Sequence, residues 1–164
     1  MRPGVLRRGA VVEDDWTLLE EGLAHKAIVP LARWRRERTA LLAAGAAVGV
    51  LLPNTEDVEA LYREVGDRPL MALEFPVFSD GRALSQAVVL RNRLGFTSEL
   101  RAVGDVTRDL VFWLGRCGFD TIVPRAGEDL EACRLALDEL QVSYQAGADG
   151  RTPAWIRRRV TAAA

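Results

Sequence analysis

Phe75 to Asp105 reads FPVFSDGRALSQAVVLRNRLGFTSELRAVGD, and this stretch decides the fold. It predicts the end of a strand, a turn, a helix and a second strand, which is the pattern of an α/β fold. In such folds ligands bind beside the carboxyl ends of the strands. We therefore expect Asp80, Arg82 and Asp105 near the carboxyl ends of neighbouring strands, where they would form a candidate site.

The same alternation continues on both sides of this stretch. Buried-strand runs occur at 47–52, 70–75, 99–103 and 121–123, with a further short strand an option at 142–145. Apolar stripes of helical period follow them. They occur in 58–65, 83–94, 107–117 and 130–140. Strands that alternate with helices indicate βαβ units and a parallel sheet. We expect an α/β fold with an open, mostly parallel sheet of four to five strands, flanking helices and a short N-terminal β extension. The order of the strands cannot be read from the sequence.

The length fits a single α/β domain over 1–164. Residues 1–45 would form the N-terminal β extension plus a helix, 46–145 the βαβ core, and 146–164 a C-terminal helical tail. Within the extension, the acidic run 13–15 predicts a turn between short strands. In the tail, Trp155 precedes a run of arginines. The tail is interpreted either as a solvated terminal helix or as a helix that docks onto a partner through Trp155.

Composition excludes several classes of function. The net charge of −1 gives no global reason to expect nucleic acid. The longest apolar run, 40–53, is too short for a membrane span, and the first residues lack the apolar segment of a secretory signal. A cytoplasmic location is therefore expected. Two cysteines and one histidine give no metal-ligand pattern, so no metal site is expected.

The candidate site has a structural alternative at each residue. Asp80 would either cap the following helix or take part in a site. Arg82 lies in the first turn of that helix, where a cation opposes the helix dipole. It would either bind an anion at the helix N-terminus or pair with Asp80. Ser85 and Arg91, further along the helix, are candidate substrate-binding residues.

The next strand and its exit supply the other candidates. Arg101, inside the strand, needs a partner if it is buried. A structural ion pair with Glu99 on the same face is one interpretation, and a site shared with Asp105 is the other. Asp109 follows Asp105 by one turn, so the two carboxylates could hold a cation or stabilise the helix N-terminus. The predicted catalytic set is Asp80, Arg82, Arg101 and Asp105, and Asp109 joins the substrate-binding candidates.

The helix over 107–117 carries apolar residues on two sides. Leu110, Trp113 and Leu114 form one stripe, whereas Val111 and Phe112 lie off it. A helix that is apolar on two sides is either fully buried or covered by another subunit. This pattern motivates a homodimer hypothesis.

Four ordered blocks, FPVFSDGR, SQAVVLRNRLGF, ELRAVGDV and RCGFD, resemble a bacterial family of uncharacterised proteins. Its members are labelled probable oxidoreductases of sulfite reduction, and their genes lie beside those of assimilatory sulfite reductase. The sequence departs from the family pattern at Leu84, Val88 and Leu110, where tyrosine, arginine and glutamine are usual.

The resemblance implies an accessory role in assimilatory sulfite reduction, within sulfur assimilation and cysteine biosynthesis. Sulfite reductase, or another protein of that pathway, would be the partner. The sequence has no glycine-rich dinucleotide or P-loop motif, and no set of residues for a sirohaem–iron–sulfur unit, so the cofactor stays unknown.

Two other functions stay open at this point. One is a small-molecule enzyme or anion-binding module, in which Arg82 and Arg101 hold an anion and Asp105, with Asp80, orients it or transfers a proton. The other is a flavin-using reductase, which only the family label and a flavodoxin-like pattern suggest. Whether the protein catalyses any reaction is not decided by its sequence.

Overall fold

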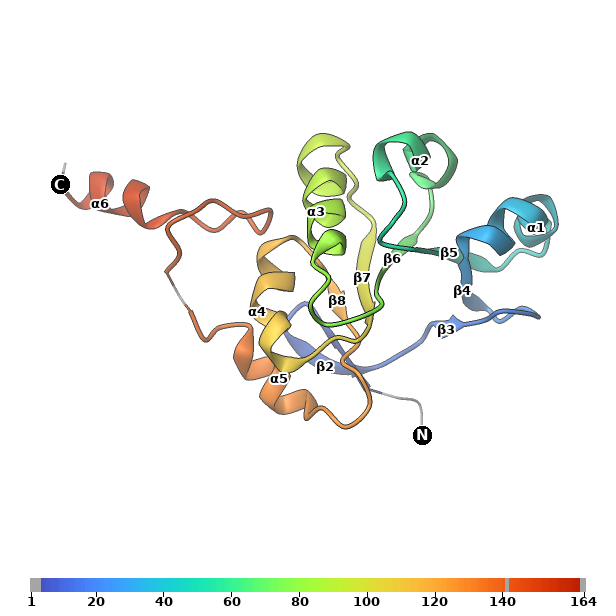
Figure 1. The fold of residues 1–164 in the computed structure, drawn as a ribbon, viewed down its shortest axis with the longest axis horizontal. Helices are drawn as coiled ribbons and strands as arrows, with labels where there is room; N and C mark the ends of the chain where they lie inside the picture. The colour runs from blue at the N-terminus through green and yellow to red at the C-terminus, as the bar shows by residue number, and fades with distance from the viewer. Residues whose placement is uncertain (1–3, 141, 163–164) are drawn as a thin grey trace.

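The structure is a computed structural model, and it describes residues 4–140 and 142–162. Strands and helices alternate along most of the chain (Figure 1). In chain order the elements are β1 (Gly4–Arg7), β2 (Ala10–Glu13), β3 (Thr17–Leu18), β4 (Lys26–Pro30), α1 (Leu31–Ala43), β5 (Ala47–Leu52), α2 (Val58–Val65), β6 (Leu70–Phe75), α3 (Arg82–Val88), a π-helical turn (Val89–Arg93), β7 (Glu99–Gly104), α4 (Arg108–Arg116), β8 (Thr121–Ile122), α5 (Leu130–Ala136) and α6 (Ala154–Ala162).

The expected open sheet of four to five strands is wrong. The strands form one eight-stranded sheet in the order β2-β1-β8-β7-β6-β5-β4-β3. Strands β3 to β8 run parallel, whereas β1 is antiparallel to both of its neighbours, so the sheet is mixed. The N-terminal strands are therefore not an extension beside the sheet. They complete it at both edges, with β1 and β2 beyond β8 and β3 beyond β4.

A short connection explains why this sheet curls into a half-barrel. Strands β2 and β3 lie at opposite edges, yet only residues 14–16 join them. Four residue steps span at most about 14 Å of extended chain. The edges of a flat eight-stranded sheet would lie roughly 34 Å apart at about 4.8 Å per strand. The sheet must therefore bend, and residues 14–16 cross its concave side.

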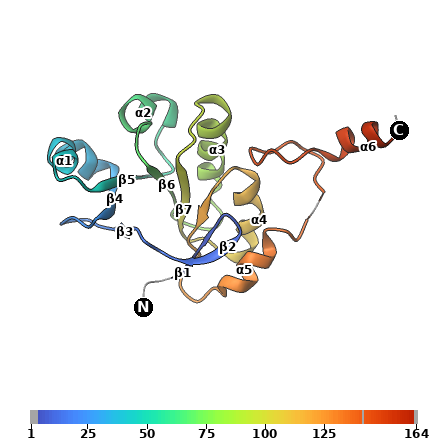
Figure 2. The ribbon, with the colours of Figure 1, turned by 180° about the vertical axis from the view of Figure 1, so that it is seen from behind.

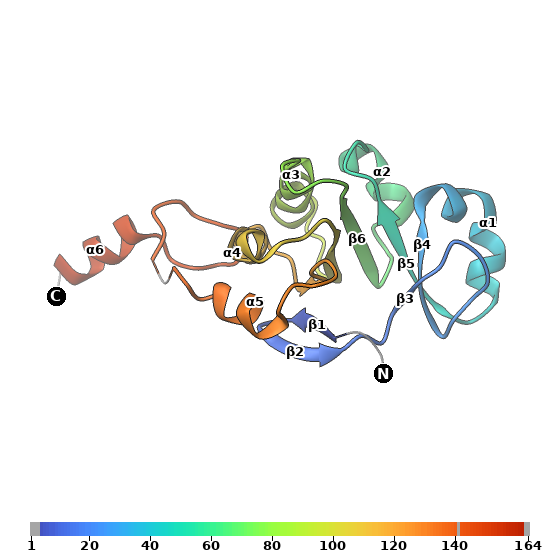
Figure 3. The same cartoon turned by 60° about the horizontal axis from the view of Figure 1, so that its bottom comes forward.

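The helices that follow the parallel strands cover the outer, convex face. Figure 3 shows α1, α2, α3 and α4 one after another on that side. Most of the buried apolar side chains lie between these helices and the sheet. Helix α5 packs against α4 and against β1 and β2 (Figure 2). A second, small cluster of Trp16, Ile28, Leu70 and Ala72 fills part of the concave side.

Most of the predicted elements of the central region are confirmed. Strands β5, β6 and β7 and helices α2 and α4 lie where their patterns place them. The predicted helix over 83–94 is present as α3 and the π-helical turn, and Gly95 follows it with φ of 68°. The optional strand at 142–145 is wrong, because its described residues, 142–145, pair with no other strand.

The predicted buried stripe of α4 needs a correction. Val111, Phe112 and Leu114 are buried, whereas Trp113 is 55% exposed. Helix α5 packs against α4 and occupies the side that the stripe left open. Burial of Val111 and Phe112 within one chain removes the observation that motivated a homodimer.

Among the described residues, no helix has the length and apolar character that crossing a membrane requires. Helix α6 falls within the predicted tail and stands away from the sheet and its helices (Figure 1).

Candidate functional site

Three loops leave the carboxyl ends of β6, β7 and β8 and are neighbours, because these strands are adjacent in the sheet. They span 76–81, 105–107 and 123–129. We refer to them as the carboxyl-edge loops. Since α/β folds bind ligands at this edge, the carboxyl-edge loops form a candidate site.

Gly104 sets the position of the Asp105 backbone. It has φ of 101°, a region that favours glycine. A Cβ atom at this position would lie only 2.3 Å from the Phe75 carbonyl oxygen. The next residue, Asp105, donates its backbone N–H to that same oxygen at 2.7 Å. The β7 exit therefore lies directly against the end of β6.

The Asp105 carboxylate connects all three carboxyl-edge loops. One oxygen accepts a hydrogen bond from the Phe78 backbone N–H at 2.8 Å, and the other accepts one from Arg125 at 2.9 Å. The Phe78 N–H, followed by the Arg125 guanidinium, lowers the pKa of Asp105 below its usual value. Asp105 is therefore a stable carboxylate at neutral pH, which suits a positioning role better than proton transfer.

Asp80 and Arg82 form a pair at the start of α3. The Asp80 carboxylate accepts the Arg82 backbone N–H at 3.2 Å, and it also binds the Arg82 side chain at 2.6 Å and 3.0 Å. The Arg82 guanidinium holds the pKa of Asp80 far below its usual range. The Arg82 side chain is nevertheless 58% exposed. Asp80 thus both caps α3 and pairs with Arg82, and the Arg82 side chain still remains accessible to a ligand or partner.

Ser85 lies with Arg82 in a shallow hollow of about 260 Å³ between α2 and α3. Asn54 and Gln86 also line it. Gln86 fixes the wall of the hollow by donating to the carbonyl oxygens of the chain before α2, at 2.8 Å and 3.1 Å. Asp105 does not line this hollow. The structure therefore brings Arg82 and Ser85 together and leaves Asp105 on a separate part of the edge.

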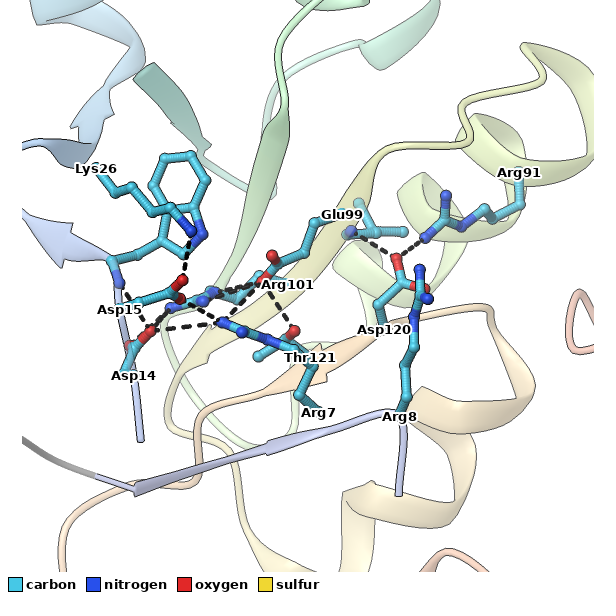
Figure 4. A network of polar contacts seen from close by, with 12 residues as sticks. Arg7, Arg8, Asp14, Asp15, Lys26, Arg91, Glu99, Arg101, Asp120 and Thr121 are labelled. Atoms are coloured by element: carbon cyan, nitrogen blue, oxygen red, sulfur yellow. Dashed lines mark hydrogen bonds and ion pairs between the residues drawn. The ribbon is translucent and has the colours of Figure 1, made fainter. Parts of the chain in front are cut away.

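Arg101 lies elsewhere, on the concave side near the amino ends of the parallel strands (Figure 4). It is 1% exposed. One end of its guanidinium binds Asp14 at 2.7 Å and 2.9 Å, and the other binds Glu99 at 2.9 Å and 3.2 Å. The expected pair with Glu99 is present, whereas the expected partner Asp105 binds Arg125 instead.

These contacts belong to a larger group that we call the concave-side network. Thr121 donates to Glu99 at 2.8 Å, Arg7 donates to Asp15 at 2.7 Å, and Lys26 binds the other oxygen of Asp15 (Figure 4). Lys26, followed by Arg7, lowers the pKa of Asp15 well below its usual range. The network balances three cations, Arg7, Lys26 and Arg101, against three carboxylates, Asp14, Asp15 and Glu99. In parallel barrels, this amino-terminal end serves stability more than chemistry.

Arg91 connects the π-helical turn to the chain around Gly118. It donates to the carbonyl oxygens of Gly118 at 2.8 Å and Ser98 at 3.0 Å, and it pairs with Asp120 (Figure 4). The Asp120 carboxylate also accepts the Leu100 backbone N–H at 2.9 Å. The Arg91 side chain is 14% exposed. Its hydrogen-bonding capacity is thus used largely within the protein.

Asp109 points to solvent on α4. Its side chain is 78% exposed, and its ion pair is with the adjacent Arg108 at 3.4 Å. Within 4–140 and 142–162, no group of three or more histidine, cysteine, aspartate or glutamate side chains is arranged to hold a metal ion. Burial raises the pKa of the Cys117 and Cys133 thiols, which disfavours their reactive thiolate forms.

Sequence reasoning missed several residues of these clusters, among them Arg125 and Asp14. Arg125 lies in the loop that follows β8, as Asp105 lies in the loop that follows β7, and a charged residue after a predicted strand is the signal that could have found it. Asp14 belongs to the acidic run whose pattern predicts a turn. No local spacing connects it with Arg101, because the two residues are 87 positions apart.

A family model described as "Bacterial protein of unknown function (DUF934)" matches residues 49–155, which is more than half of the chain. The chain belongs to this family. The DUF934 match includes every candidate site residue and begins within β5, so it leaves out β1 to β4 and the Asp14 side of the concave-side network. A search of curated proteins finds no match. Membership of DUF934 does not by itself assign an activity.

Proposed function

We propose that this DUF934 protein is a cytoplasmic accessory protein of assimilatory sulfite reduction, and that it acts by contacting a protein of that pathway. The resemblance of its four sequence blocks to proteins encoded beside sulfite reductase supports the pathway. The carboxyl-edge loops support the mode of action, because they present apolar and charged side chains together on a well-fixed surface.

The observation that carries the mode of action is the loop between β6 and α3. Val77 and Phe78 are 52% and 47% exposed, although both are apolar. The Asp105 carboxylate holds the Phe78 backbone in place, and the exposed guanidinium of Arg82 lies a few residues away. Exposed aromatic side chains and arginines are both enriched at protein interfaces relative to the rest of a protein surface.

The pathway is tested by growth of a deletion strain on sulfate, sulfite, sulfide or cysteine as the sole sulfur source. We expect growth on sulfide and cysteine, and none or little on sulfate and sulfite. Normal growth on all four sources would contradict a role at the sulfite step.

The contact surface is tested by co-purification of sulfite reductase with tagged protein. We expect Phe78→Ser to lose the partner and to fail in the growth assay. Leu18→Ser is the matched control, because Leu18 is also apolar and 51% exposed but lies on β3, at the far edge of the sheet. Equal recovery of the partner with both variants would show that the loop is not the contact.

A second candidate function is the binding of a small anion at the same edge. Arg82 and Arg125 have side chains that are 58% and 50% exposed, and Asp80 and Asp105 hold them in place. These carboxylates also compete with an anion, which is why this function ranks second. Calorimetric titration with sulfite and with inorganic phosphate tests it. Binding that Arg82→Ala and Arg125→Ala each weaken supports it, and no heat with either anion excludes these ligands.

A further inference from the structure

An apolar groove on α4 lies outside the carboxyl-edge loops. It has a volume of about 540 Å³, and its lining includes Val88, Trp113, Leu140, Val142 and Tyr144. Four of these side chains are more than half exposed, with Trp113 at 55% and Tyr144 at 76%. We call it the Trp113 groove. Contiguous exposed apolar surface of this kind marks an interaction site more often than a surface left in water.

Helix α6, by contrast, packs against little of the part of the chain that the structure describes. It has nine residues, Ala154–Ala162, and helices shorter than about 12 residues are marginal unless they pack against something. Among the described residues, α6 makes only marginal contacts with other helices and strands, and it stands away from them (Figures 1 and 3). It begins with Trp155, which is 44% exposed.

The chain between the groove and α6 is fixed, so α6 leaves in a defined direction. The Ala154 backbone N–H donates to the Ser143 carbonyl oxygen at 2.9 Å. The Arg116 side chain, which is 8% exposed, binds Asp149 at 2.6 Å and also binds the Gln145 carbonyl oxygen. These contacts hold 143–154 against the end of α4, with α6 directed outward rather than back onto its own groove (Figure 3).

The charges around the groove and along α6 are complementary. Asp109 lies one helical turn before Trp113 and is 78% exposed, and Glu139, beside Leu140, is 57% exposed. Arg108 pairs with both carboxylates, so the three side chains together carry a net negative charge. Arg157 and Arg158 follow Trp155 and are exposed. A basic helix with an aromatic residue near its start therefore complements an apolar groove whose neighbouring charged side chains are negative on balance.

We propose that α6 of a second copy of this chain occupies the Trp113 groove, and that the exchange is reciprocal. Each copy then supplies one helix and one groove, which gives a closed two-fold dimer. The same contact would cover the exposed apolar side chains of the groove and would give α6 a surface to pack against. The inference does not depend on the proposed function, because the Trp113 groove shares no residue with the carboxyl-edge loops.

The test is the mass of the full chain in solution, measured by light scattering after size-exclusion chromatography at micromolar concentrations. We expect twice the mass of one chain for the wild type. Trp113→Glu, in the groove, and Trp155→Glu, in α6, should each give single chains with unchanged circular dichroism. Leu135→Glu is the matched control, because Leu135 is 59% exposed on α5 and does not line the groove. This variant should remain dimeric.

Mixing the two variants tests directly whether α6 is exchanged between copies. Trp113→Glu retains an intact α6, and Trp155→Glu retains an intact groove, so the mixture should associate through one contact while each variant alone does not. A monomeric wild type overturns the proposal. A dimer that survives both substitutions overturns it too, as do variants that stay monomeric when mixed.

Discussion

Arg101 carries a full positive charge at a position that is 1% exposed. Its partners Asp14 and Glu99 are also largely buried, with side chains 10% and 19% exposed. We predict that Arg101→Leu lowers the free energy of unfolding by about 3–5 kcal/mol, because two carboxylates then lose their shared cation. Denaturation in urea, followed by circular dichroism, measures this change.

The comparison for that measurement is Arg82→Ala, which breaks an exposed pair with Asp80. Such exposed pairs contribute little to stability, because water screens the two charges. If the two substitutions lower the free energy of unfolding equally, Arg101 does not anchor the concave-side network. A functional role for Arg101 would then be favoured over a structural one.

Asp15 gives a prediction for the dependence of stability on pH. Lys26 and Arg7 lower its pKa in the folded protein, whereas the pKa of a free aspartate is about 3.9. The stabilisation from Asp15 is therefore present above that value and is lost as the pH falls through the folded pKa. We expect Asp15→Asn to be less stable than the wild type at pH 7, with a difference that shrinks as the pH approaches 2. A constant difference across this range would contradict the assignment.

At this scale, local residue pairs were predictable and distant ones were not. The Asp80–Arg82 pair and the Glu99–Arg101 pair each join residues two positions apart, so their contact follows from local geometry. The Asp14–Arg101 contact requires the whole sheet to form, and no spacing in the sequence encodes it.

Gly104 controls how β7 meets β6. We predict that Gly104→Ala destabilises the protein by more than the roughly 1–3 kcal/mol of a strained backbone alone, because the new Cβ would also press on the Phe75 carbonyl at 2.3 Å. Gly45→Ala is a matched control, since Gly45 also has positive φ, 70°, but has open space around it. Equal losses of stability in urea denaturation would mean that the close approach has no energetic effect.

Arg116 fixes the segment that leads from α4 to α6. We predict that Arg116→Ala increases hydrogen exchange in 142–153, because the segment loses its contacts with the guanidinium. The strands should exchange as before. Hydrogen-exchange mass spectrometry measures both, and Arg108→Ala, which removes an exposed arginine on the same helix, serves as the control. Unchanged hydrogen exchange in 142–153 would show that Arg116 does not hold this segment in place.

The elements themselves were largely predictable, but their surroundings were not. A buried strand or an apolar stripe is a local pattern, so β5, β6, β7 and α2 follow from the sequence. Which side of α4 is buried depends on α5. The sequence placed Trp113 on the predicted apolar stripe, and it left open whether Phe112, off that stripe, is buried within the chain or covered by another subunit. In the structure Phe112 is buried and Trp113 is exposed.

For the whole molecule, the N-terminal strands are part of the sheet and not an addition to it. We predict that a fragment of 19–164 aggregates or lacks a cooperative unfolding transition, because it exposes the edges of β8 and β4 and removes Asp14 from Arg101. A fragment of 1–153 takes no strand from the sheet and should unfold cooperatively. Size-exclusion chromatography and urea denaturation compare the two. A soluble 19–164 fragment with cooperative unfolding would contradict the prediction.

The strand order was not predictable, because strands pair through backbone groups that are nearly the same for every residue type. An alternation of strands and helices is shared by open sheets and by barrels. The distinction here depends on the short connection 14–16 between two edge strands. Once that connection is known, the curl of the sheet follows from chain length alone.

The pairing of β1 with β8 has a consequence for synthesis on the ribosome. Strand β1 can pair with β2 as soon as both have emerged, but its other edge pairs with β8, the last strand of the sheet, through Leu6 and Ile122. Long-range pairing of this kind slows folding, and it leaves an unpaired hairpin exposed during translation. For most of its synthesis, the nascent chain therefore presents a strand edge that a chaperone or a neighbouring chain can capture.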